Sequence, residues 1–140
     1  MPVNYFSEET QFLLSEPEAH ASWINSVIEL ESHEASDINF IFCSDDYLLE
    51  LNRKHLNHDY YTDVITFDNT EDTGGISGDV FISIDRVAEN AEKLAFTLQD
   101  ELDRVMVHGV LHLLGYGDKT EKEALEIRKK EDHYLSLRAF

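Results

Sequence analysis

One segment, HGVLHLLGYGD at residues 108–118, constrains the fold of this chain more than any other. Between residues 105 and 114, every residue is apolar except His108, Gly109 and His112. A helix that is apolar nearly all round belongs in the interior of a protein. Because residues four positions apart lie on the same face of a helix, both imidazoles point the same way. The segment therefore predicts a central, buried helix with two histidines on one face.

The residues after this helix favour a metal site. Glycine accepts the left-handed conformation in which helices commonly end, so Gly115 marks a turn that can bring Asp118 back to the histidines. Two imidazoles, one carboxylate and an open fourth position form the ligand set of a catalytic zinc site. Two buried imidazoles without partners would cost about 1–3 kcal/mol each. We therefore expect one zinc ion on His108, His112 and Asp118; the alternative is a pair of core histidines held by hydrogen-bond acceptors.

This motif does not define a general base. In the zinc peptidase signature HExxH a glutamate follows the first histidine, and here that position holds Gly109. A peptidase of that type is therefore not expected. Asp63 and Asp79 are candidates for the base, although no spacing in the sequence places either of them beside the metal.

Length and composition indicate one globular domain over residues 1–140. No apolar run approaches the roughly 20 residues of a membrane span, and the N-terminus lacks the basic and apolar regions of a secretory signal. Cys43 is the only cysteine, which excludes an intrachain disulfide. These features predict a cytoplasmic protein with no membrane partner.

The chain is strongly acidic, with a formal net charge of −18. Residues 1–52 contain 11 Asp and Glu and no Lys or Arg. Because phosphate binding depends on Lys and Arg, this balance opposes non-specific binding of nucleic acid, and no DNA partner is expected. Two interpretations stay open for five basic residues, either a local basic groove or solvated and ion-paired surface positions: Arg53, Lys54, Arg86, Lys93 and Arg104.

Helical and alternating patterns predict an α+β fold in which helices pack on a small mixed sheet. Ser44 and Asp85 are the expected N-caps of two helices, and Thr120 with Glu123 fits a capping box. The run at 69–75 is expected to be a turn that joins two strands of a hairpin. Strands are expected at 3–6 (a short edge strand), 37–43, 63–68 and 78–84, and helices at 18–31, 44–55, 85–94, 98–114 and 119–137.

Three separated stretches resemble the YbeY family of bacterial metal-dependent rRNA maturation factors or endoribonucleases. The family reads approximately LNxxYRxxDxPTDVLSF, GDI-IS and HGxLHLxGYDH. The chain has LNRKHLNHDYYTDVITF at 51–67, GDVFIS at 78–83 and HGVLHLLGYGD at 108–118. The resemblance extends over about residues 45–120 and is most specific in the last stretch.

The resemblance implies a zinc-dependent endoribonuclease specific for single strands, which acts in 16S rRNA 3′ end processing and ribosome biogenesis. It implies rRNA and ribosomal particles as partners. Thr62 and Asp79 also match family positions, either as groups that orient the metal ligands or as turn and strand-end residues.

The chain departs from the family at two important positions. Asp118 stands where the family has its third histidine; a carboxylate is a good zinc ligand, so the site is retained with one more negative charge. Leu56 stands at the position of an arginine that looks like a phosphate or RNA contact in the family, next to His55 in place of a tyrosine. We therefore expect weak RNA binding through a restricted patch, to which His58 or Arg53 can contribute.

Two other functions stay open. The first is a non-catalytic, ribosome-associated assembly factor with a structural metal, favoured by the missing arginine and the acidic charge, although structural zinc usually has four protein ligands. The second is a metal-dependent hydrolase of a small substrate. A closed pocket at the site would favour the small substrate, whereas an open groove lined by basic side chains would favour RNA.

Overall fold

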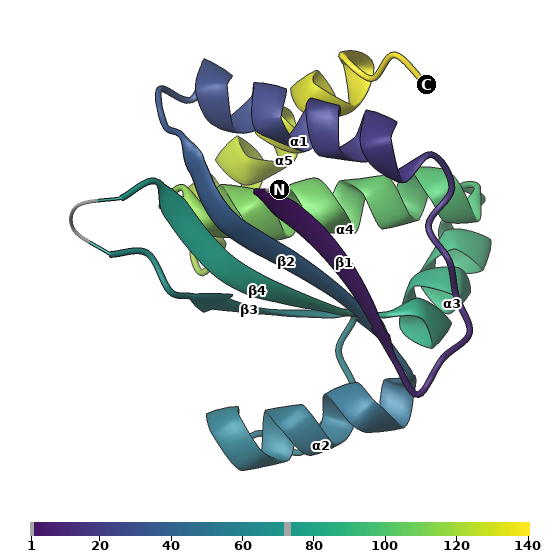
Figure 1. Ribbon diagram of the computed structural model, residues 1–140. Coiled ribbons are helices and arrows are strands. Elements are labelled where there is room, and N and C mark those ends of the chain that lie inside the picture. Colours follow the sequence, from purple (N-terminus) through teal and green to yellow (C-terminus); the bar gives the residue numbers. More distant parts are fainter. Residues whose placement is uncertain (1, 72–73) are drawn as a thin grey trace.

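A four-stranded mixed sheet forms the middle of the fold in the computed structural model, which describes residues 2–71 and 74–140 (Figure 1). Its order is β1-β2-β4-β3, with β1, β2 and β4 parallel and β3 antiparallel to β4. The α+β class, the edge strand and the hairpin are thus confirmed. Two residues of the predicted turn, Asp72 and Thr73, lie outside the described residues. The strands are β1 (Val3–Glu8), β2 (Ala35–Cys43), β3 (Val64–Asp68) and β4 (Ile76–Ser83).

Helices cover both faces of this sheet (Figure 1). α4 and α1 pack on one face with α5 against α4, whereas α2 lies on the other face. Side chains alternate accordingly along β4: Val80 faces α4, and Phe81 stacks on Tyr47 of α2. In the part of the chain that is described, no helix combines the length and apolar character needed to cross a membrane. The helices are α1 (Pro17–Leu30), α2 (Asp45–Leu56), α3 (Ile84–Leu94), α4 (Leu98–Leu113) and α5 (Glu121–Ser136).

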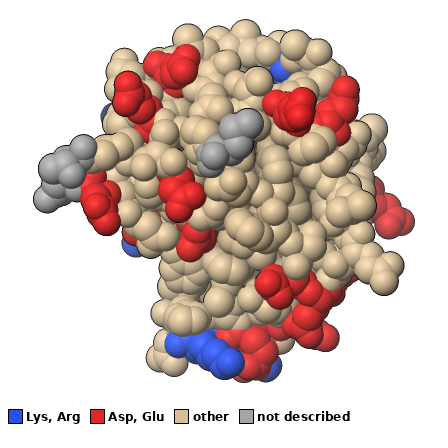
Figure 2. Space-filling view, viewed as in Figure 1, with Lys and Arg blue, Asp and Glu red and all other residues tan. Residues whose placement is uncertain are grey.

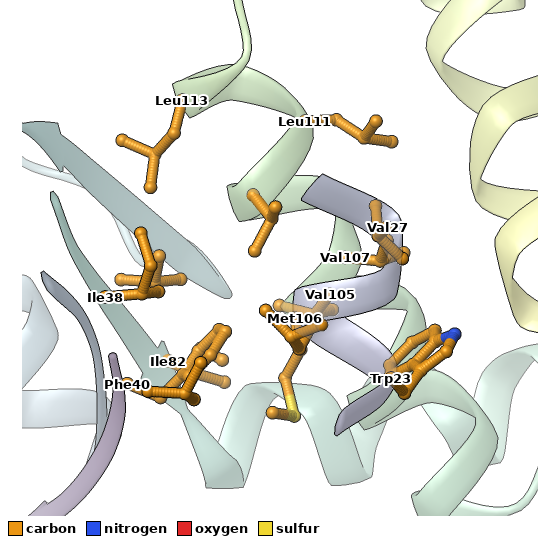
Figure 3. Packing of buried hydrophobic residues seen from close by; sticks show 14 of the residues in the cluster. Trp23, Val27, Ile38, Phe40, Ile82, Val105, Met106, Val107, Leu111 and Leu113 are labelled. Carbon is orange, nitrogen blue, oxygen red and sulfur yellow. The ribbon is translucent and has the colours of Figure 1, made fainter. Parts of the chain in front are cut away.

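α4 is the central helix, as the apolar segment predicts. Most of its residues are buried, and Figure 3 shows Met106 and its neighbours between Trp23 of α1 and Phe40 of the sheet. Gly109 marks a close approach to β4, because a Cβ atom there would lie only 2.6 Å from Cγ1 of Val80. A glutamate at this position would point into the sheet, which explains in packing terms why an HExxH arrangement is absent.

The predicted helix caps are confirmed with one exception. Ser44 accepts a hydrogen bond from the backbone of α2, and the capping box at the start of α5 is complete. The prediction that Asp85 caps α3 is wrong: Ser83 is the N-cap, and its Oγ accepts from the N–H of Arg86 at 3.1 Å. Asp85 lies in the first turn and instead accepts from the N–H of Asp45 at 2.9 Å. Serine and aspartate are both good caps, so local sequence does not decide between two candidates so close together.

Candidate metal centre

The end of α4 brings Asp118 back over the two histidines. Gly115 has a φ of 103°, which a residue with a side chain rarely adopts. The N–H of Tyr116 donates to the carbonyl of Leu111, and the N–H of Gly115 donates to the carbonyl of His112, each at 3.0 Å. These two bonds form a Schellman motif, so the predicted glycine turn is confirmed.

Three electron-pair donors converge at this turn. Nε2 of His108 and Nε2 of His112 are 2.9 Å apart, and Oδ2 of Asp118 lies 3.5 Å from the first and 3.3 Å from the second. Tetrahedral zinc, with bonds of about 2.0–2.1 Å, separates its ligand atoms by about 3.3 Å. The side chain of Asp118 is 45% exposed, so the cluster can be reached from solvent. The structure thus brings the three predicted residues together in a geometry that can hold one metal ion.

The opposite nitrogens of both rings fix the direction of these donors. Nδ1 of His112 donates to the carbonyl of Tyr116 at 2.8 Å, and Nδ1 of His108 donates to Oε2 of Glu131 at 2.6 Å. Since a carbonyl can only accept, the neutral ring of His112 carries its proton on Nδ1 and presents a lone pair at Nε2. When His108 is neutral, its Nε2 also presents a lone pair, and the two lone pairs and the carboxylate of Asp118 repel unless a cation, either a metal ion or a proton on His108, lies among them. The donor set therefore accepts a cation, and a metal ion would contact all three donors at once.

Glu131 of α5 orients the ring of His108 by binding its Nδ1, on the side opposite the donor atom Nε2. It is buried, and its second oxygen accepts from Nη1 of Arg104 at 2.9 Å. Burial opposes the ionisation of Glu131, but the hydrogen bonds from His108 and Arg104 lower its pKa. Burial likewise opposes the charged form of His108, yet the hydrogen bond and the charge of Glu131 raise its pKa. A carboxylate behind a metal-binding histidine fixes the ring and makes it a better ligand.

The role of Glu131 has no signature in the sequence. It lies 23 residues after His108 on a different helix, and acidic residues are common along the exposed faces of such helices. Its burial arises only when α5 packs on α4, so the contact is purely tertiary.

Two cavities of about 400 and 630 Å³ meet at His108 and Asp118, and His112 lines the second of them. Both are lined by Asp63, Val64, His108 and Asp118, so the cluster lies where the two adjoin. The first cavity continues between α4 and α5, where it is also lined by Glu101, Arg104, Val105, Ala124, Ile127, Arg128 and Glu131. The second continues toward the end of α2, where it is also lined by Asn52, Leu56, Tyr60, Thr62, Ile65, Thr66, Asp68, His112, Leu113 and Lys119.

The two candidate bases have different positions. Asp63 lines both cavities, and burial raises its pKa although the charge of His108 acts in the opposite direction. Asp79 lies on the other face of the sheet, where it accepts hydrogen bonds from the amides of Asn39 at 3.0 Å and Asn69 at 3.3 Å. Its predicted roles at the metal therefore have no support in the structure, whereas Thr62 does line the second cavity.

The five basic residues do not form a groove. Arg53 pairs with Glu50 and Asp59, and Lys93 pairs with Glu89. In Figure 2 the clearest group of Lys and Arg lies at the lower end, where Figure 1 places α2. Arg86 pairs with Asp45 and Glu89 on another part of the surface, and of the five only Arg104 lines a cavity at the donors. The interpretation as surface and ion-paired residues is therefore the better one.

Comparisons with known proteins agree with this architecture. A model of the protein family described as Endoribonuclease YbeY matches residues 5–138. The endoribonuclease YbeY of Cytophaga hutchinsonii is 53% identical over 138 residues, covering 99% of this chain and 96% of its own. That of Amoebophilus asiaticus is 48% identical, covering 95% and 90%. The solution structure of a Thermotoga maritima protein matches with a TM-score of 0.68 and 27% identity, covering 96% of this chain and 87% of the other. This chain belongs to the YbeY endoribonuclease family.

Proposed function

We propose that this protein is a metal-dependent endoribonuclease that cleaves single-stranded RNA, and that it acts in the cytoplasm in 16S rRNA 3′ end processing and ribosome biogenesis. One observation carries the proposal: the donors of His108, His112 and Asp118 converge where two cavities meet. A site that continues to both sides suits a strand that passes through it better than a small enclosed substrate. Family membership supports RNA as the substrate, and rRNA and ribosomal particles as partners.

We propose zinc as the metal, because two imidazoles and a carboxylate suit it. When bound, zinc polarises a phosphoryl oxygen and makes water more acidic. The chain contributes the orientation of the ligands, since Glu131 holds His108 and the carbonyl of Tyr116 holds His112. Disturbing such partners typically lowers metal affinity or activity about 10- to 100-fold.

We assign Asp63 as the proton acceptor for the attacking water. Asp63 lines both cavities, as His108 does, and a raised pKa brings a carboxylate nearer to the range in which general bases work. Arg104, Arg128 and Lys119 line the same cavities, and Arg128 and Lys119 can face the phosphates of a bound strand. Arg104 is held in place by Glu131 and Asp132.

The test measures metal content and RNA cleavage on the same preparations. Wild type should carry about one equivalent of metal, as a single three-ligand site requires. It should cleave single-stranded RNA, lose activity with a chelator and regain it with zinc. His112→Ala should lose both metal and cleavage, and Asp63→Asn should keep the metal but lose most of the cleavage. His133→Ala, at an exposed histidine on α5, is the matched control and should resemble wild type.

The outcomes separate the alternatives. Full metal content in His112→Ala would remove this histidine from the ligand set. A metal-loaded wild type that binds ribosomal particles but cleaves no RNA would favour the assembly factor with a structural metal. Hydrolysis of small phosphodiesters without any RNA binding would favour the hydrolase of a small substrate.

A further inference from the structure

The second cavity has an apolar and aromatic wall beside the three donors. Leu56, the last residue of α2, is 41% exposed, and Tyr60 in the following loop is 56% exposed. Both line the cavity that also contains His108 and His112. Large apolar groups exposed together at a functional cleft mark a surface that contacts a ligand.

Both the backbone and the ring of Tyr60 have partners close by in the chain. Its backbone carbonyl accepts a hydrogen bond from Nδ2 of the buried Asn52 at 2.9 Å. Its ring stacks on His58, with centroids 5.2 Å apart and an interplanar angle of 24°. The phenol oxygen also lies 3.1 Å from Nδ1 of His58. Because His58 stacks on one face of the ring and the residue as a whole is more than half exposed, the other face is available to a ligand.

The charges around this wall do not favour recognition through phosphates. Among the residues described as lining the second cavity, Lys119 is the single Lys or Arg. Arg53, one turn before Leu56, is engaged by Glu50 and Asp59. With few cations available for phosphates, the interaction favoured here is the stacking of an uncharged group, and every nucleobase has a face that can stack on an aromatic ring.

We propose that Tyr60 and Leu56 form a nucleobase-binding subsite. An unpaired base of the RNA stacks on the free face of Tyr60 and contacts Leu56, while a neighbouring phosphodiester lies at His108, His112 and Asp118. The inference rests on the proposed function and adds to it how the strand is held. Since a base within a duplex cannot reach the ring, this subsite selects unpaired nucleotides. A cavity of about 630 Å³ lies within the size range of small-molecule sites and has room for a nucleotide.

The test combines Tyr60 variants with abasic RNA. A labelled single-stranded RNA and a series with one abasic ribose at each position in turn are titrated against metal-loaded protein. Tyr60→Leu should weaken binding about 5- to 150-fold, the range measured for loss of one base–aromatic stack. The slope of log K against log salt should not change, because no phosphate contact is lost. Tyr60→Phe should stay within about threefold of wild type, since the aromatic face remains.

The abasic series provides the sharper readout. Wild type should show one position at which removing the base weakens binding about as much as Tyr60→Leu does. In Tyr60→Leu that sensitivity should disappear, since the two changes remove the same contact. Tyr61→Leu is the matched control, because this neighbouring exposed tyrosine donates to Asp46 and contacts Arg86 instead of lining the second cavity. Unchanged metal content and thermal unfolding would exclude misfolding.

The outcomes distinguish the subsite from the function. Suppose that wild type binds and cleaves RNA, and that Tyr60→Leu binds the intact RNA and each abasic RNA as tightly as wild type does. The subsite is then overturned and the endoribonuclease proposal stands. If wild type neither binds nor cleaves RNA at low salt, both are overturned.

Discussion

At the scale of single residues, the groups behind the two histidines determine what the site can do. Glu131 and the carbonyl of Tyr116 each hold one Nδ1–H, so both Nε2 atoms are directed at the same point as Asp118. Neither support could be predicted from the histidine spacing, because one is a backbone oxygen in a turn and the other lies on α5. The ligand pair itself could be predicted, because helical periodicity alone places His108 and His112 on one face.

Asp118 is the residue on which the ligand set can be tested most directly. If it is the third ligand, Asp118→Ala should lose more than the roughly 10- to 100-fold in metal affinity that removal of a supporting group causes. Asp118→His should keep the metal, because imidazole is an equally good zinc ligand and the turn still returns the chain. Competition titration with a metal indicator would measure both variants beside Lys119→Ala as the control. Equal metal affinity in wild type and Asp118→Ala would show that the carboxylate is only part of the turn.

At the scale of elements, a buried ionic network fastens α1 to α4 and to the end of the chain. Nε2 of His20 lies 2.7 Å from Oδ1 of Asp103, and both side chains are almost fully buried. Nδ1 of His20 donates to the carbonyl of Glu16 at 3.0 Å, and Arg138 donates to the second oxygen of Asp103 at 2.6 Å. With an acceptor at each ring nitrogen, His20 is best satisfied as an imidazolium. Burial lowers its pKa, but the hydrogen bond and charge of Asp103 outweigh burial and raise the pKa above its ordinary value.

This network predicts a pH-dependent contribution to stability. Because the pKa of His20 is higher in the folded state, its contribution is complete below the unfolded value of about 6.5 and declines as pH rises through the folded value. His20→Gln should therefore lower the free energy of unfolding most at pH 5.5–6, by about 3–5 kcal/mol, as when a buried pair loses one partner. The difference from wild type should shrink toward pH 9. Urea unfolding of wild type and His20→Gln between pH 5.5 and 9 measures this difference, and His33→Gln, at an exposed histidine, is the control. A difference in the free energy of unfolding that does not depend on pH would contradict a charged His20 in this network.

Elements could be predicted where their signals are local. The caps at Ser44 and Thr120 and the glycine at 115 lie within a few residues of the helix ends that they stabilise. The strand order could not be predicted, because the parallel pairing of β2 with β4 joins segments separated by α2 and β3. β3 in turn pairs with β4, and this pairing places Asp63, the residue before β3, in the same cavity as residues of α4. No spacing in the sequence indicates that these residues lie close together.

At the scale of the whole molecule, the proposed function requires a protein with a net charge of −18 to bind RNA, which is itself a polyanion. On the face seen in Figure 2, Asp and Glu side chains are spread over the surface, and Lys and Arg are few. Three basic side chains line the two cavities within the described part of the chain: Arg104, Lys119 and Arg128. The net charge of −18 opposes binding anywhere else. RNA binding should therefore be confined to the two cavities at the metal centre and depend on contacts to few phosphates.

The salt dependence of RNA binding tests this confinement. Each phosphate contact to a single strand contributes about −0.7 to the slope of log K against log salt. We expect two to four contacts, and hence a slope of about −1.4 to −2.8. Leu56→Arg should make the slope steeper by about 0.7 and tighten binding, because this position faces the cavity of the three donors. Leu30→Arg makes the same charge change at an exposed position on α1 and serves as the matched control.

The two arginine variants separate a local contact from a general change in charge. Both reduce the net negative charge by one, so a long-range effect would strengthen binding equally in both. A contact in the cleft changes the slope only in Leu56→Arg, since only a cation within reach of a phosphate releases a counterion. Equal slopes in the two variants would show that a side chain at position 56 does not reach a phosphate of the RNA. A wild-type slope much steeper than −3 would show that the strand follows a wider surface than the cleft, in spite of the acidic residues around it.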